Sequence, residues 1–157
     1  MDRITIEKER VMENLEKLVE QGKALAEKHS WVKDAHEKMV NRINFLLAQV
    51  PPMKEPALLF FLGEEWHSPE YGRRIYARLS FQPETLLDFE ECPVGDCSYV
   101  RTISLSLPTI RAFGEKFEEM AEFFLDEIEK RSAALEPAKI VFEKLLREMR
   151  DEPTRRG

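Results

Sequence analysis

The stretch that sets the fold of this chain is RRIYARLSF, residues 73–81. Apolar side chains stand at every second position with polar side chains between them, which is the period of a strand that buries one face. The predicted buried face carries Ile75, Ala77, Leu79 and Phe81, and the opposite face carries Arg74, Tyr76, Arg78 and Ser80.

Neighbouring stretches extend this strand into a sheet. TLLDFEE (85–91) follows the turn sequence QPE, and SYVRTISLSL (98–107) follows CPVGDC, so the three predict an antiparallel meander. ALLFFL (57–62) is apolar on both faces and predicts a more buried fourth strand. A sheet of three or four strands is therefore expected over 57–107, with helices covering the face that bears Leu79, Phe81, Leu87, Phe89, Ile103 and Leu105.

The N-terminal segment 4–50 follows a different period. Apolar residues recur seven apart from Ile4 to Leu46, and a second series offset by four completes a heptad pattern. No proline stands between residues 2 and 50, so the pattern predicts one long helix ended by Pro51-Pro52. The alternative is a helical hairpin that turns at His29-Ser30.

The C-terminal segment 108–150 is also predicted to be helical, because its apolar residues recur at three- and four-residue spacing. Pro137 is expected to kink or break this helix, and 151–157 is typical of a frayed, charged tail. The whole chain, 1–157, is thus predicted to be a single α+β domain. It is similar in outline alone to prefoldin-like chaperone subunits and carries none of their sequence signature, so the likeness implies no function.

The composition narrows the class of function. The net charge is −6, with 24 basic residues against 30 acidic ones, so no bulk positive field attracts nucleic acid or anionic lipid. The N-terminus is charged, and no apolar stretch approaches the roughly 20 residues that span a bilayer. We therefore expect a cytoplasmic protein with no membrane partner. Few Asn and Gln beside many Glu, Lys and Arg suggest a thermophilic source.

Two histidines, His29 and His36, lie seven residues apart in the heptad pattern. We interpret them as polar seam residues whose ring nitrogens find carbonyls, carboxylates or water. A pH-sensitive interface is an alternative, as is a metal site, although about 10 Å along the helix axis is too far for one shared zinc ion. The pattern predicts self-association, as a dimer, through Leu18, Leu25, His29, Val32, His36 and Met39.

Cys92 and Cys97 stand at the two ends of a tight strand connection. We favour two ordinary reduced thiols, because the sequence between them is good turn chemistry by itself. A disulfide that closes the hairpin is an alternative. A zinc or redox site is another, which would need a further ligand such as His67.

The stretch GEEWHSPEYG (63–72) is expected to form a loop that carries Glu64, Glu65 and His67. Acidic and imidazole groups in one loop are weak candidates for general acid/base chemistry or for a ligand pocket. The same composition is ordinary for an exposed loop.

The polar face of the strand 73–81 presents Arg74, Tyr76 and Arg78. Alternating arginine and tyrosine can bind acidic peptides or single-stranded nucleic acid. Cross-strand pairing with Asp88 and Glu90 is the interpretation that we prefer, because it needs no ligand.

No phosphate loop, dinucleotide-binding glycine motif, nucleophile elbow or paired-histidine zinc motif occurs in the chain, so neither a cofactor nor a metal is predicted. The strongest features are the helix-packing patterns. They favour a non-enzymatic, cytoplasmic assembly or interaction protein, an oligomeric adaptor or chaperone-like subunit, with a protein partner of unknown identity. The alternative is a small-ligand-binding protein or enzyme that uses the Glu64–Tyr71 loop.

Overall fold

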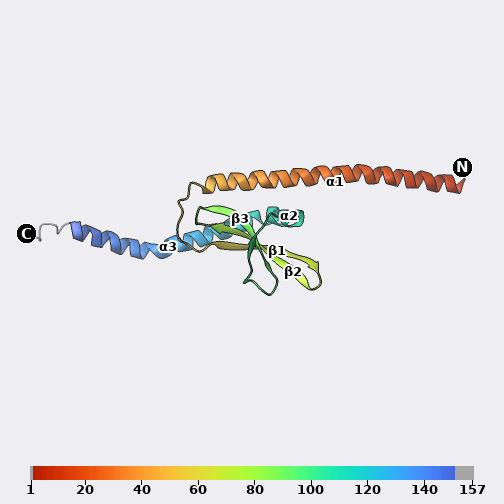
Figure 1. Cartoon of the computed structure of the whole chain (residues 1–157). Helices are drawn as coiled ribbons and strands as arrows, with labels where there is room; N and C mark the ends of the chain where they lie inside the picture. The colour runs from red at the N-terminus through yellow and green to blue at the C-terminus, as the bar shows by residue number, and fades with distance from the viewer. Residues whose placement is uncertain (1, 151–157) are drawn as a thin grey trace, which may run out of the picture. The chain divides into compact units, whose positions relative to one another are not determined.

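The computed structural model describes residues 2–150 of the chain. These residues fall into two compact units, one that ends at Glu115 and one that begins at Lys116. The first unit holds a long helix, a sheet and a short helix, and the second holds one long helix (Figure 1). The order of elements confirms the predicted α+β fold class.

Helix α1, Arg3–Leu47, is one uninterrupted helix of 45 residues. Asp2 caps its first turn, because the Asp2 carboxylate accepts a hydrogen bond from the amide of Ile4. The prediction of a single long helix is confirmed. The hairpin at His29-Ser30 is wrong, since that stretch holds no residue that breaks the backbone hydrogen bonds of a helix.

The sheet is four-stranded and antiparallel throughout, in the order β1-β2-β3-β4. Each strand is paired with the next one along the chain, so the connections are short. The strands are β1, Leu58–Ser68; β2, Tyr71–Ser80; β3, Leu86–Pro93; and β4, Arg101–Thr102.

The core of the first unit lies on one face of this sheet. Ile75, Ala77, Leu79 and Phe81 are all buried, as the alternation in 73–81 predicted. Helix α2, Leu107–Glu115, contacts β1, and the C-terminal part of α1 contacts both β3 and α2. The other buried apolar side chains of this unit are Leu58, Leu62, Leu87, Phe89, Cys92, Ile110 and Phe113.

Two strand predictions are wrong. The expected strand 98–107 is reduced to the two residues of β4, and α2 already begins at Leu107. The expected loop 63–72 instead forms the turn end of a β-hairpin, because β1 continues to Ser68 and β2 begins at Tyr71. Its polar residues form a regular antiparallel ladder that runs from Gly63 opposite Ile75 to Trp66 opposite Gly72.

The second unit is formed by helix α3, Phe117–Arg150. The helix continues through Pro137, so it is not broken there, and the interruption of the C-terminal helical segment falls at Lys116. Met120 and Phe124 are its buried residues. The predicted tail, 151–157, lies outside the described residues. Within residues 2–150, no helix is both long enough and apolar enough to cross a membrane.

Candidate functional site

The most extensive candidate site is an exposed, mostly apolar stripe on the N-terminal part of α1. Between Arg3 and Trp31, every side chain is exposed except that of Ala24, which is half-buried. The heptad positions are exposed with the rest, and Leu18 and Leu25 keep 66% and 67% of their surface in solvent. We call this stripe the α1 seam; it consists of Ile4, Val11, Leu15, Leu18, Gly22, Leu25 and His29.

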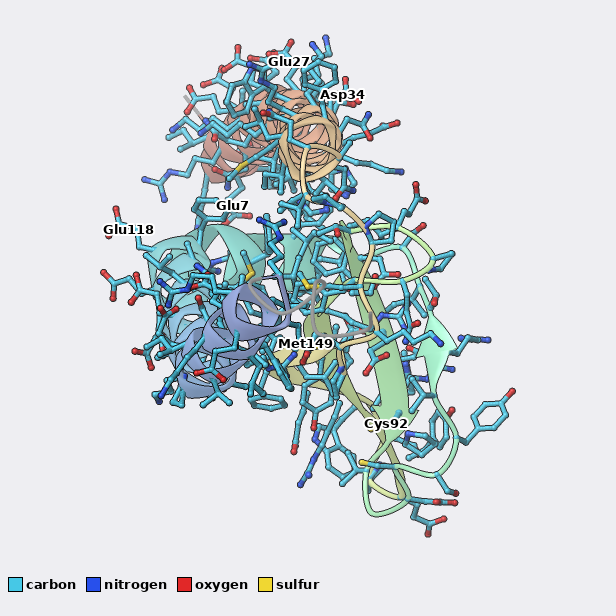
Figure 2. All side chains as sticks on the ribbon, turned by 90° about the vertical axis from the view of Figure 1, so that its left-hand side faces the viewer. Glu7, Glu27, Asp34, Cys92, Glu118 and Met149 are labelled. Carbon is cyan, nitrogen blue, oxygen red and sulfur yellow. The ribbon has the colours of Figure 1, made fainter. Side chains whose placement is uncertain are left out.

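The α1 seam is broadened along one side only. Met12, Val19 and Ala26 each follow a seam residue directly, and all three are exposed. The opposite side of the helix is charged: Glu27 and Asp34, seven residues apart, lie together on the side of α1 that points away from the sheet (Figure 2). The helix is therefore amphipathic over a length in which the described residues bury none of its apolar stripe.

The same heptad pattern is used differently beyond Trp31. The heptad residues Val32, His36 and Ile43 are half-buried, in the part of α1 that packs on β3 and α2, and so are Val40 and Leu47, which each follow a heptad residue directly. Of the residues predicted to form an interface, Leu18, Leu25 and His29 thus lie on the exposed part, Val32 and His36 on the packed part, and Met39 is partly exposed.

His36 is half-buried and its ring packs against two aromatic core residues. Its ring centroid lies 5.6 Å from that of Phe89 and 5.1 Å from that of Phe113. Its Nδ1 is buried and has no hydrogen-bond partner among the described residues. Burial lowers the pKa of His36 and outweighs the opposing effect of Glu37.

The sequence predicts that Glu64, Glu65 and His67 share a loop, but in the structure all three lie on strand β1. Glu64 accepts hydrogen bonds from Trp66 Nε1, at 3.1 Å, and from Arg74. The ring of His67 lies 5.9 Å from that of Tyr71.

Glu65 serves α2. It accepts hydrogen bonds from the hydroxyls of Ser106 and Thr109, at the N-terminus of that helix. A carboxylate at this position satisfies hydroxyl donors and interacts favourably with the helix dipole. Glu64 and Glu65 thus have different hydrogen-bond partners, while His67 is close enough to Glu65 to help lower the pKa of its carboxyl.

The arginines of the polar strand face are paired across the sheet. Arg78 faces Asp88 in register and binds it with two hydrogen bonds, of 2.7 and 2.5 Å, while a second contact of 3.4 Å reaches Glu90. Arg74 pairs with Glu64. The pairing of Arg78 with Asp88 and Glu90 is the cross-strand pairing that the sequence predicts, whereas the partner of Arg74 is Glu64.

A polar cluster at the end of the sheet remote from α1 was not predicted from the sequence. Glu91 is buried and accepts hydrogen bonds from Arg73 on β2 and Arg101 on β4. A signal was present, because Arg73 and Glu91 both fall on the apolar side of their strands' alternation. A charged residue at such a position needs a partner of opposite charge.

Cys92 lies beside this cluster, at the end of the sheet remote from α1 (Figure 2). It is buried, whereas Cys97 is exposed, and both are free thiols. Within residues 2–150, no group of three or more histidine, cysteine or acidic side chains is arranged to hold a metal ion.

Comparisons with family models, with curated proteins and with solved structures give no match to this chain.

Proposed function

We propose that this chain is a non-enzymatic cytoplasmic assembly protein that pairs with a second copy of itself through the α1 seam. The exposure of the seam over seven helical positions supports this proposal. A helix in water owes most of its stability to the packing of its apolar face, and exposed apolar stripes are normally buried by a partner. The partner with a matching heptad pattern is the same helix of another copy.

The pattern of the seam favours antiparallel pairing. In an antiparallel coiled coil, the two heptad series face each other, so Leu15 of one copy packs against Leu18 of the other. The remaining layers then pair Val11 with Gly22, Lys8 with Leu25 and Ile4 with His29. In this arrangement the aliphatic stem of Lys8 covers Leu25 while its ammonium group reaches solvent.

The residues that flank the seam are complementary in the same register. Glu7 of one copy faces Lys28 of the other, and Asn14 faces Gln21, so the polar flank pairs opposite charges and two amides. On the other flank, Met12 faces Val19, which buries apolar surface against apolar surface. Each of these pairs occurs twice, because the antiparallel dimer has twofold symmetry.

Parallel pairing lacks this complementarity. It would place Lys8 against Lys8 and His29 against His29, and two facing lysines repel each other. Glu7 would face Met12 and find no cation. The antiparallel arrangement is therefore the one that we propose.

Sedimentation velocity at micromolar concentration tests the dimer. We expect the native chain to be dimeric and Leu18→Glu to be monomeric, because the dimer loses two buried leucines at about 2 kcal/mol each, or more than about 100-fold in Kd. Ile6→Glu is the matched control, since Ile6 is also exposed but lies off the seam. A native monomer, or an equal effect of both substitutions, would refute the proposal.

A charge exchange tests the orientation. In the antiparallel dimer, Glu7→Lys and Lys28→Glu each create two like-charged contacts and should weaken dimerisation several-fold at low salt, by about 0.5 kcal/mol per contact. The double variant restores opposite charges and should recover the native Kd. If the double variant stays as weak as the single ones, the pairing is not antiparallel in this register.

A further inference from the structure

Cys92 and Cys97 are in direct contact. Their Sγ atoms lie 2.9 Å apart, whereas a covalent S–S bond measures about 2.05 Å. Both thiols are free, with Cys92 buried at the end of β3 and Cys97 exposed in the loop that follows. The contact therefore joins one protected thiol to one that solvent can reach.

The backbone between the two cysteines is already turned to hold them together. Asp96 donates its amide hydrogen to the carbonyl of Pro93, and Gly95 has φ +87°, a conformation that side-chain-bearing residues rarely adopt. Val94 is bound in turn to the carbonyl of Gly72 on β2. Forming a bond between the sulfurs thus requires no rearrangement of the loop.

The surroundings distinguish the two thiols. Burial and the contact with Cys97 raise the pKa of Cys92 to about 11, so Cys92 stays protonated at neutral pH. An open pocket lies against Cys92 and is lined by Tyr71, Arg73, Glu91, Tyr99 and Arg101. The exposed Cys97 is the thiol that a reagent meets first.

We propose that Cys92 and Cys97 form a reversible redox pair, oxidised by exchange with a low-molecular-weight disulfide. The Cys97 thiolate attacks one sulfur of that disulfide, forms a mixed disulfide and releases the first small thiol. Cys92 then loses its proton to solvent, its thiolate attacks Cys97 Sγ, and the second small thiolate leaves and takes up a proton. Two protein thiols are oxidised and one small disulfide is reduced to two thiols.

The bond fastens a lightly held segment to the sheet. Strand β4 consists of two residues only, and its position depends on the pairing with β3 and on the contact of Arg101 with Glu91. A covalent link at Cys97, four residues before Arg101, restricts the path of this segment over the pocket. Oxidation thereby sets how freely Tyr99 and Arg101, which line the pocket, can move.

Mass spectrometry of the native chain, incubated with oxidised glutathione and then alkylated, tests the pair. We expect the native chain to lose two hydrogens and carry no glutathione. Cys92→Ser should retain one glutathione on Cys97, because the second step is missing. Cys97→Ser should stay unmodified, because its remaining thiol is buried.

Several results would overturn the proposal: a native chain that remains a dithiol, one that retains glutathione, or one linked to a second copy by a disulfide. Glutathione on Cys97→Ser but not on Cys92→Ser would overturn the assigned roles. Brief alkylation of the unsubstituted chain followed by peptide mapping gives a check that no variant can confound, and Cys97 should react first. A faster reaction at Cys92 would contradict the proposed order of steps.

Discussion

The side-chain amide of Asn44 on α1 binds the backbone of Leu87 on β3 as a neighbouring strand would. Its Oδ1 accepts the Leu87 N–H at 2.7 Å, and its Nδ2 donates to the Leu87 carbonyl at 3.0 Å. Strand β4 pairs with β3 only at Glu90 and Glu91, so Asn44 satisfies backbone groups that β4 does not reach.

Asn44→Ala should therefore destabilise the fold by about 2 kcal/mol, because both part-buried backbone groups of Leu87 lose their partner. Asn41→Ala, one turn earlier and exposed, should cost little. The free energies of unfolding in urea measure the difference. Equal costs for the two variants would show that the Leu87 contact contributes nothing.

His36 should make stability depend on pH. Burial places its pKa below 6.5 in the folded state, so between that lower pKa and 6.5 the unfolded chain binds a proton that the folded chain does not. The stabilising contribution is present above pH 6.5 and is lost as pH falls below it. The melting temperature of His36→Phe should fall less between pH 7 and 5 than that of the native chain.

Gly72 should not tolerate a side chain. A Cβ atom there would lie 2.6 Å from ring carbons of Trp66, which is its partner in the ladder between β1 and β2. Gly72→Ala must displace the indole, and we expect a loss of about 1–3 kcal/mol with a shift in Trp66 fluorescence. Gly63→Ala is the control, since a Cβ atom at Gly63 meets no other atom within 4 Å. Measurement in a Trp31→Phe background isolates the Trp66 signal, and an unchanged spectrum for Gly72→Ala would contradict the packing described.

Glu65 should stabilise α2 only while it is ionised. Burial by itself would raise its pKa, but the hydrogen bonds from Ser106 and Thr109, together with nearby positive groups, lower it below 4.5. Glu65→Gln should cost about 0.5–1 kcal/mol at pH 7, the magnitude of a charge at a helix N-terminus. Because the folded-state pKa is depressed, this cost should shrink as pH falls below 4.5, and Glu70→Gln in the exposed β1–β2 turn should show neither effect.

Periodicity predicted the parts of the fold that depend on one segment alone. The alternation in 73–81 identified the buried face of β2, and the heptad pattern identified α1 as one helix. The polar composition of 63–72 led to the wrong prediction of a loop. Glu64 and Glu65 are instead strand residues, because β2 places Arg74 and Arg73 opposite them. Pairing with a neighbouring strand outweighed local composition.

Contacts between segments that lie far apart along the chain could not be predicted from the sequence. Asn44 and Leu87 are 43 residues apart, and no local pattern links them. The heptad pattern is the same on both sides of Trp31, so it carries no signal that His36 packs against Phe89 and Phe113 while His29 is exposed. The proximity of Cys92 and Cys97 was predictable, because a short turn joins them, but the burial of only one was not.

The length of α1 has a consequence for any partner that recognises the sheet. If two helices pair antiparallel with Leu15 opposite Leu18, the packed segments that begin at Val32 lie at opposite ends of the pair, about 45 Å apart at 1.5 Å per residue. The two sheets then form a bivalent display with a fixed spacing. A partner with two sites at that spacing would gain avidity from the second contact, whereas one with a short linker between its sites would bind a single sheet.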